Sequence, residues 1–230
     1  MRKVLVYGPR PKPVRPPVYR WNFWTSFSVM VSMRTSLPTI GLCLLASSLA
    51  LHGEVTGTCD RKFEAKFQPG GAMRMQIRSG DIEVTGGDSP LVRVTCELKR
   101  DEEARDITIR FSADGNSGSL RVRGGPNNDV RIRIEVPKSS GLFVRAPAGD
   151  LTVSGVTGDK DVEIHAGDLT ISVGNPADYK HADASVWAGD LSASAFGVTK
   201  DGLFRSFDKD NTSGKYRLHA HVGAGDLVLK

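Results

Sequence analysis

Apolar and polar residues alternate from residue 73 to the end of the chain. The alternation is clearest in residues 73–78, 92–98, 107–111 and 130–136, and only residues 101–105 look briefly helical. Successive side chains of a β-strand point to opposite faces, so each of these segments predicts a strand with one buried and one solvent-facing side. The pattern therefore predicts an all-β protein.

A tetrapeptide repeats within this pattern. Ala-Gly-Asp-Leu occurs at residues 148–151, 166–169, 188–191 and 224–227, and Ser79–Ile82 is a variant. The aspartates are 18, 22 and 36 residues apart. An interval near 20 with two short strands per unit is typical of a solenoid, so we expect a single-stranded β-solenoid, or β-helix-like coil, of about 18–22 residues per turn. The interval of 36 predicts an insertion or a degenerate coil.

The chemistry of the tetrapeptide suits a corner between strands. Glycine adopts positive φ without steric cost, and an aspartate oxygen can accept a hydrogen bond from a nearby backbone N–H. Calcium binding is the alternative, because calcium prefers several carboxylate and carbonyl ligands, but we favour the turn-forming role. The predicted corner residues are Asp81, Gly149, Asp150, Gly167, Asp168, Gly189, Asp190, Gly225 and Asp226.

Three segments carry a resemblance to a known family. Residues 136–145, 148–159 and 162–171 resemble the bacterial putative-adhesin family, whose members are exported β-solenoids of unknown function. The resemblance covers roughly residues 73–230 and fades in residues 193–216. It implies an exported coil with an adhesin-like role, and it brings no catalytic or binding residues with it.

The N-terminal region is typical of a targeting segment. Residues 36–50 carry no charge and follow Met33-Arg34, which predicts a signal peptide over residues 33–53 with cleavage after Ala50 or nearer Gly53. An uncleaved anchor remains an alternative. Residues 1–32 are rich in proline, arginine and aromatic residues, and we interpret them as a disordered extension or as a reading frame that starts too early. The solenoid domain is then residues 54–230, exported to the periplasm, the outer surface or the medium.

Charge and cysteines agree with export. Seven of the 31 basic residues precede residue 35, whereas all 26 acidic residues lie from Glu54 onward. The basic overall charge thus belongs to the leader, which argues against nucleic-acid binding and limits membrane contact to an uncleaved leader. Cys59 and Cys96 would form one disulfide in an oxidising compartment; alternatively, Cys96 is a small core residue.

Candidate chemistry is sparse. His219 and His221 lie two apart on one strand face and could share a metal, but two ligands do not make a zinc site, and solvent-exposed histidines are the simpler interpretation. We therefore predict no catalytic residue, no cofactor and no metal. Outward arginines of consecutive strands could gather into a strip that binds an anionic ligand: Arg110, Arg121, Arg123, Arg131 and Arg133.

These features together predict a non-enzymatic envelope or surface protein. It would act as an adhesin-like binding or scaffold module, with an unidentified glycan, protein or other surface ligand as its partner. The first alternative is a polysaccharide lyase on a β-helix, which would need a positioned base and a charge-neutralising group. The second is a membrane-anchored partner in envelope stress or regulation.

Overall fold

The computed structural model describes residues 53–126 and 129–230, which form strands and three short 3₁₀ helices. The predicted all-β class is confirmed. The 3₁₀ helices are η1 (Asp101–Asp106), η2 (Pro176–Asp178) and η3 (Ser194–Phe196). Within these residues, no helix has the length and apolar character needed to cross a membrane. The predicted extension (1–32) and all but the last residue of the predicted signal peptide (33–53) lie outside the described residues.

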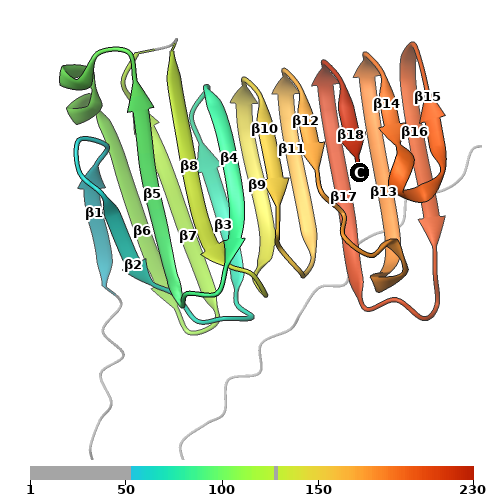
Figure 1. Cartoon of the computed structure of the whole chain (residues 1–230), viewed down its shortest axis with the longest axis horizontal. Helices are drawn as coiled ribbons and strands as arrows, with labels where there is room; N and C mark the ends of the chain where they lie inside the picture. Colours follow the sequence, from blue (N-terminus) through green and yellow to red (C-terminus); the bar gives the residue numbers. More distant parts are fainter. Residues whose placement is uncertain (1–52, 127–128) are drawn as a thin grey trace, which may run out of the picture. The chain divides into compact units, whose positions relative to one another are not determined.

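The strands form two mixed sheets of nine strands each, which we call sheet A and sheet B (Figure 1). In spatial order, sheet A contains β1 (Glu54–Thr58), β6 (Ile107–Asp114), β7 (Ser117–Gly124), β3 (Ala72–Ile77), β9 (Gly141–Ala148), β11 (Lys160–Ala166), β17 (Tyr216–Ala224), β13 (Tyr179–Ala188) and β16 (Leu203–Asp210). Sheet B contains β15 (Val198–Lys200), β14 (Leu191–Ala193), β18 (Leu227–Leu229), β12 (Leu169–Ile171), β10 (Leu151–Ser154), β4 (Asp81–Gly87), β8 (Val130–Pro137), β5 (Leu91–Leu98) and β2 (Phe63–Lys66).

The middle of each sheet is parallel and the ends are antiparallel. From β9 to β14 the chain alternates between the sheets, with odd-numbered strands in sheet A and even-numbered strands in sheet B. Strands β9 and β11 pair in parallel, as do β10 and β12. The edge strands β1, β2, β15 and β16 all pair antiparallel with their neighbours.

The last strands do not follow sequence order. Strand β17 lies between β11 and β13, and β18 lies between β12 and β14. The chain therefore leaves a position open after β12, forms β13 and β14 one position further out, and returns at its end to fill the gap. Residues 194–210, which include η3, β15 and β16, form an insertion at the edge. This insertion accounts for the interval of 36 residues between the last two corner aspartates.

One hydrophobic core fills the space between the buried faces of the two sheets. Aliphatic side chains stack in rows across neighbouring strands; Val144, Val162 and Ala220 form one such row in sheet A and are fully buried. Burial of this apolar surface is the main stabilising contribution, at roughly 25 cal/mol per Å². The alternation seen in the sequence thus corresponds to one face on this core and one face toward solvent.

The glycine corners stack with very close backbone contact. Gly167 has a φ of +117°, and a Cβ atom on it would lie 2.2 Å from the carbonyl oxygen of Gly149. Gly149, Gly225 and Gly189 are in the same position toward their neighbours, with Cβ-to-oxygen distances of 2.0–2.2 Å. Only glycine permits both the positive φ and this approach. The corners therefore fix how the strands on either side align.

The corner aspartates extend the stacking into a hydrogen-bonded ladder. The Asp168 N–H donates to Asp150 Oδ1 (3.3 Å), the Asp226 N–H to Asp168 Oδ1 (2.9 Å), and the Asp190 N–H to Asp226 Oδ1 (2.9 Å). Asp81 differs, because its carboxylate pairs with Arg131 at 2.9 Å. The ladder runs in the order 150, 168, 226 and 190, which is the spatial order of the strands.

A disulfide links the two sheets near the edges formed by β1 and β2. Cys59 follows β1 of sheet A, Cys96 belongs to β5 of sheet B, and the two form a disulfide with a Cα–Cα distance of 5.4 Å. The bond closes a loop spanning 37 residues, which on the chain-entropy model stabilises the fold by about 4 kcal/mol.

One charged side chain lies inside the core. Lys160 is 1% exposed and forms no ion pair with any described residue. Its Nζ donates hydrogen bonds to the hydroxyl of Tyr179 and to the carbonyl of Gly158, and the Tyr179 hydroxyl donates to the Val173 carbonyl (3.1 Å). Burial lowers the pKa of Lys160 to about 8 and raises the pKa of Tyr179 to about 12. Burying the protonated Lys160 at neutral pH therefore makes the free energy of folding less favourable.

The corner stacking predicts that Gly167→Ala is strongly destabilising. The added methyl group would meet the Gly149 carbonyl and would occupy positive φ, at a cost of about 2–5 kcal/mol in the free energy of unfolding. The matched control is Gly174→Ala, which has a φ of +77° but nothing within 4 Å of the new Cβ, so it should cost only about 1–2 kcal/mol. Urea unfolding measures both, and equal losses would contradict the stacking argument.

Lys160 gives a second prediction, because its pKa is lower in the folded state than in the unfolded chain. The free energy of unfolding should rise as the pH increases from 8 toward 10, since the penalty for burying the charge disappears. Lys160→Met should abolish this rise and stabilise the protein at pH 7 by up to about 3 kcal/mol. Urea unfolding at pH 7 and pH 9.5 tests this, with the exposed Lys180→Met as control; a variant less stable than wild type at pH 7 contradicts it.

Candidate functional site

The solvent-facing side of sheet A brings together polar side chains from distant parts of the sequence. The strand register aligns them in two rows that run across the sheet. The first row contains Ser119, Arg74, Phe143, Asp161, His219, Asp183 and Asp208. The second row contains Arg110, Arg121, Gln76, Arg145, Glu163, His221 and Ser185. Neighbours within a row have Cβ atoms about 5 Å apart, close enough to interact.

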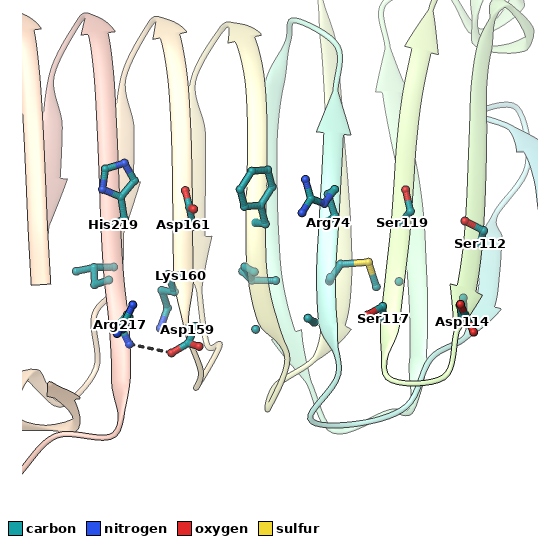
Figure 2. Close-up of a pocket in the computed structure, with 18 of the residues that line it drawn as sticks. Arg74, Ser112, Asp114, Ser117, Ser119, Asp159, Lys160, Asp161, Arg217 and His219 are labelled. Atoms are coloured by element: carbon teal, nitrogen blue, oxygen red, sulfur yellow. Dashed lines mark hydrogen bonds between the residues drawn. The ribbon is translucent and has the colours of Figure 1, made fainter. Parts of the chain in front are cut away.

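A shallow hollow of about 980 Å³ lies along the first row. Figure 2 shows Ser119, Arg74, Asp161 and His219 at one level on neighbouring strands of sheet A. The Arg217 N–H donates to Asp159 Oδ1 (2.8 Å) at its lower margin. The residues that line this hollow come from sequence positions more than 100 apart, so no local sequence motif predicts it.

Phe143 lies at the centre of the hollow between two guanidinium groups. The guanidinium carbon of Arg145 is 3.7 Å from the ring centroid, and that of Arg74 is 4.3 Å from it. Arg145 also contacts Asp161 (2.7 Å) and Glu163 (2.8 Å) through Nη2, and only about a quarter of its side chain is exposed. Arg145 thus neutralises two carboxylates, whereas Arg74 has no acidic partner among the described residues.

Histidines and aspartates gather beyond Arg145, on β17, β13 and β16. His219 Nδ1 lies 2.5 Å from Asp183 Oδ2, and His181 Nδ1 lies 2.8 Å from Asp210 Oδ1. The hydrogen bond to Asp210 raises the pKa of His181, and the charges of Asp208 and Asp183 act in the same direction. His221 points to a different partner, the Ser185 hydroxyl (2.8 Å), so His219 and His221 do not converge on one point.

Sequence reasoning missed this group. His181 and Asp183 sit in β13, Asp208 and Asp210 in β16, and His219 in β17. Antiparallel pairing of β13 with β16, and the insertion of β17 beside β13, are what bring them together. The alternation shows that each of these residues faces outward, but it carries no information on which strands become neighbours.

Arginines form a separate group at the other end of sheet A. Arg110 of β6 lies opposite Arg121 of β7, and Arg123 lies opposite Thr108. These four side chains line a small hollow of about 230 Å³. Arg110 is 3.9 Å from Glu54, and both side chains are more than half exposed. Within residues 53–126 and 129–230, neither Arg121 nor Arg123 forms an ion pair.

The single strip of five arginines does not form. Arg131 and Arg133 belong to β8, which lies in sheet B, and they pair with Asp81 (2.9 Å) and Glu83 (3.2 Å) respectively. Both also contact Glu97 of β5. The connection from β7 to β8 crosses from one sheet to the other, so consecutive strands present their outward residues on different surfaces.

Comparisons with known proteins give little to place beside this geometry. No protein-family model matches the chain. No curated protein matches it either. Among solved structures, the chain is similar to the crystal structure of a putative cell adhesion protein from Clostridium sporogenes ATCC 15579, with 12% identity and a TM-score of 0.48. The similarity covers 74% of this chain and 98% of that one.

The two kinds of arginine predict opposite effects on stability. Arg145→Gln leaves Asp161 and Glu163, which lie side by side on β11, without their shared arginine, and should lower the free energy of unfolding by about 1–2 kcal/mol. Arg121→Gln removes a like charge opposite Arg110, and should leave stability unchanged or slightly raised. Urea unfolding at low salt compares the two variants; a larger loss for Arg121→Gln would contradict the assignment.

Proposed function

We propose that this chain is an exported, non-enzymatic protein of the cell envelope or cell surface, with an adhesin-like binding role. Its binding surface is the outer face of sheet A, and its ligand is an acidic glycan. The observation that carries this proposal is the group formed by Arg110, Arg121 and Arg123, in which two of the three arginines have no acidic partner among the described residues.

Unpaired arginines at adjacent positions need a reason. Like charges directly opposite each other in a sheet are destabilising. On β8 each arginine has carboxylate partners, whereas on β7 Arg121 and Arg123 have none within the described part of the chain. Guanidinium groups bind carboxylate and sulfate groups through two parallel hydrogen bonds. A ligand with regularly spaced acidic groups would relieve the repulsion and gain these hydrogen bonds.

The fold suits a long ligand. We infer that residues 72–230 form a coil of the β-solenoid type, with about 18–22 residues per turn and one inserted edge region. Alternation of strands between the two sheets, parallel pairing of successive units and the Gly-Asp ladder support this. Such a coil holds its surface residues at fixed spacing, so the protein itself loses little conformational entropy when a polymer binds along it. Arg74 and Phe143 would extend the contact from β7 toward β9.

Binding of a sulfated polysaccharide and of polygalacturonate, with neutral dextran as reference, tests the proposal. Wild-type protein should bind both acidic polymers, more weakly at higher salt, and should release no shortened products. Arg121→Gln with Arg123→Gln should lower the affinity at least about 10-fold.

The matched control is Arg131→Gln with Arg133→Gln, which removes two arginines from sheet B that already have carboxylate partners. This variant should bind like wild type. Equal losses in both double variants would contradict the placement of the site, and absence of binding or the release of cleavage products would contradict the function.

A further inference from the structure

The histidines and aspartates of β13, β16 and β17 form a group in which no lysine or arginine of the described residues balances the carboxylates. Asp183, Asp208 and Asp210 form ion pairs with histidines only; no lysine or arginine of the described residues pairs with them. The neighbouring carboxylates Asp161 and Glu163 differ, because Arg145 lies within 2.8 Å of both. Within the described part of the chain, an arginine therefore balances one acidic group, whereas the other has histidines as its cationic partners.

The strand register places these groups as direct neighbours. His181 lies opposite Asp210, and Asp183 lies opposite Asp208, across the antiparallel pair of β13 and β16. The pairing of β13 with β17 shifts by one residue between Tyr179 and His181, which is a β-bulge. Bulges often re-aim a side chain next to a functional site.

The donor atoms have the spacing of a metal site. His181 Nε2 lies 3.4 Å from Asp183 Oδ1 and 3.7 Å from Asp208 Oδ2. Two ligands at about 2.1 Å from a tetrahedral zinc ion are separated by about 3.4 Å. Ligand atoms of a second set in the same group, His181, Asp208 and Asp210, all lie within 4.8 Å of one another. Asp183 is the better partner for Nε2, because Asp210 lies beside the other ring nitrogen, Nδ1, at 2.8 Å.

The second nitrogen of the histidine is already held. His181 Nδ1 is 2.8 Å from Asp210, which leaves Nε2 facing the two carboxylates. A carboxylate that orients a metal-bound histidine in this way is a regular feature of zinc sites. Asp183 is held similarly, because its other oxygen, Oδ2, lies 2.5 Å from His219 Nδ1.

We propose that His181, Asp183 and Asp208 bind a Zn²⁺ ion on the outer face of sheet A, with Asp210 and His219 orienting the ligands. One imidazole and two carboxylates suit zinc, with water as the fourth ligand. Calcium fits less well, since it takes six to eight oxygen ligands. The site lies on strands separate from the arginine group, so it does not depend on the proposed glycan binding.

Isothermal titration of untagged, metal-free protein with ZnCl₂ tests the assignment. Wild-type protein should bind one Zn²⁺ per chain, and Ca²⁺ in equal excess should not displace it. His181→Gln and Asp208→Asn should each weaken binding at least 10-fold. The control His165→Gln, which changes an exposed histidine of β11 outside this group, should bind Zn²⁺ like wild type.

Thermal unfolding separates loss of the site from loss of the fold. Without metal, all variants should unfold at the temperature of wild type, and Zn²⁺ should raise that temperature for wild type and His165→Gln only. Absence of saturable Zn²⁺ binding would overturn the proposal. Wild-type affinity in His181→Gln would also overturn it. If, in that case, His219→Gln abolishes binding, the metal lies at Asp161, Glu163 and His219 instead.

Discussion

The close backbone approach at the glycine corners is the constraint on which the rest of the structure depends. At Gly149, Gly167, Gly225 and Gly189, a neighbouring carbonyl occupies the space where any other residue would carry its Cβ. The aspartates that follow add hydrogen bonds from one corner to the next. Because these corners stack directly on one another, the strands that follow them start in the same register. Outward side chains at the same distance from the corner therefore form rows across the sheet.

Those rows place side chains from distant parts of the sequence next to one another on the outer face of sheet A. The out-of-order insertion of β17 places His219 between Asp161 and Asp183, so the C-terminal segment completes a surface that β11 and β13 form only in part. Charge is then distributed along the sheet in three groups: the arginines on β6 and β7, a neutralised group around Arg145, and the carboxylates on β13 and β16, which have only histidine partners among the described residues. The core holds these groups at fixed distances, and the two outer groups are the ones to which we assign the proposed glycan and zinc sites.

The sequence predicts which side chains face inward and where the corners between strands lie, but it does not predict which strands become neighbours in a sheet. Period-two alternation identified the inward residues of most strands, and the Ala-Gly-Asp-Leu repeats marked the corners. Alternation says nothing about which sheet a strand joins, so Arg131 and Arg133 were grouped with arginines that lie on the other sheet. His181 and Asp210 are 29 residues apart in the sequence, and they meet through the pairing of β13 with β16, which only the three-dimensional register defines. Lys160 was not expected in the core, because a lysine at the start of a strand normally reaches solvent.

The spatial order of the corners is the central claim, since it places β17 beside β13 and so assembles the surface on which the proposed zinc site lies. Cysteine cross-linking tests it most directly, because neighbouring strands are about 4.8 Å apart and next-nearest strands about twice that distance. The account predicts that Asp168→Cys with Asp226→Cys forms a disulfide under mild oxidation, while Asp168→Cys with Asp190→Cys does not. A disulfide between positions 168 and 190, and none between 168 and 226, would mean that the corners stack in sequence order. That result would contradict the account.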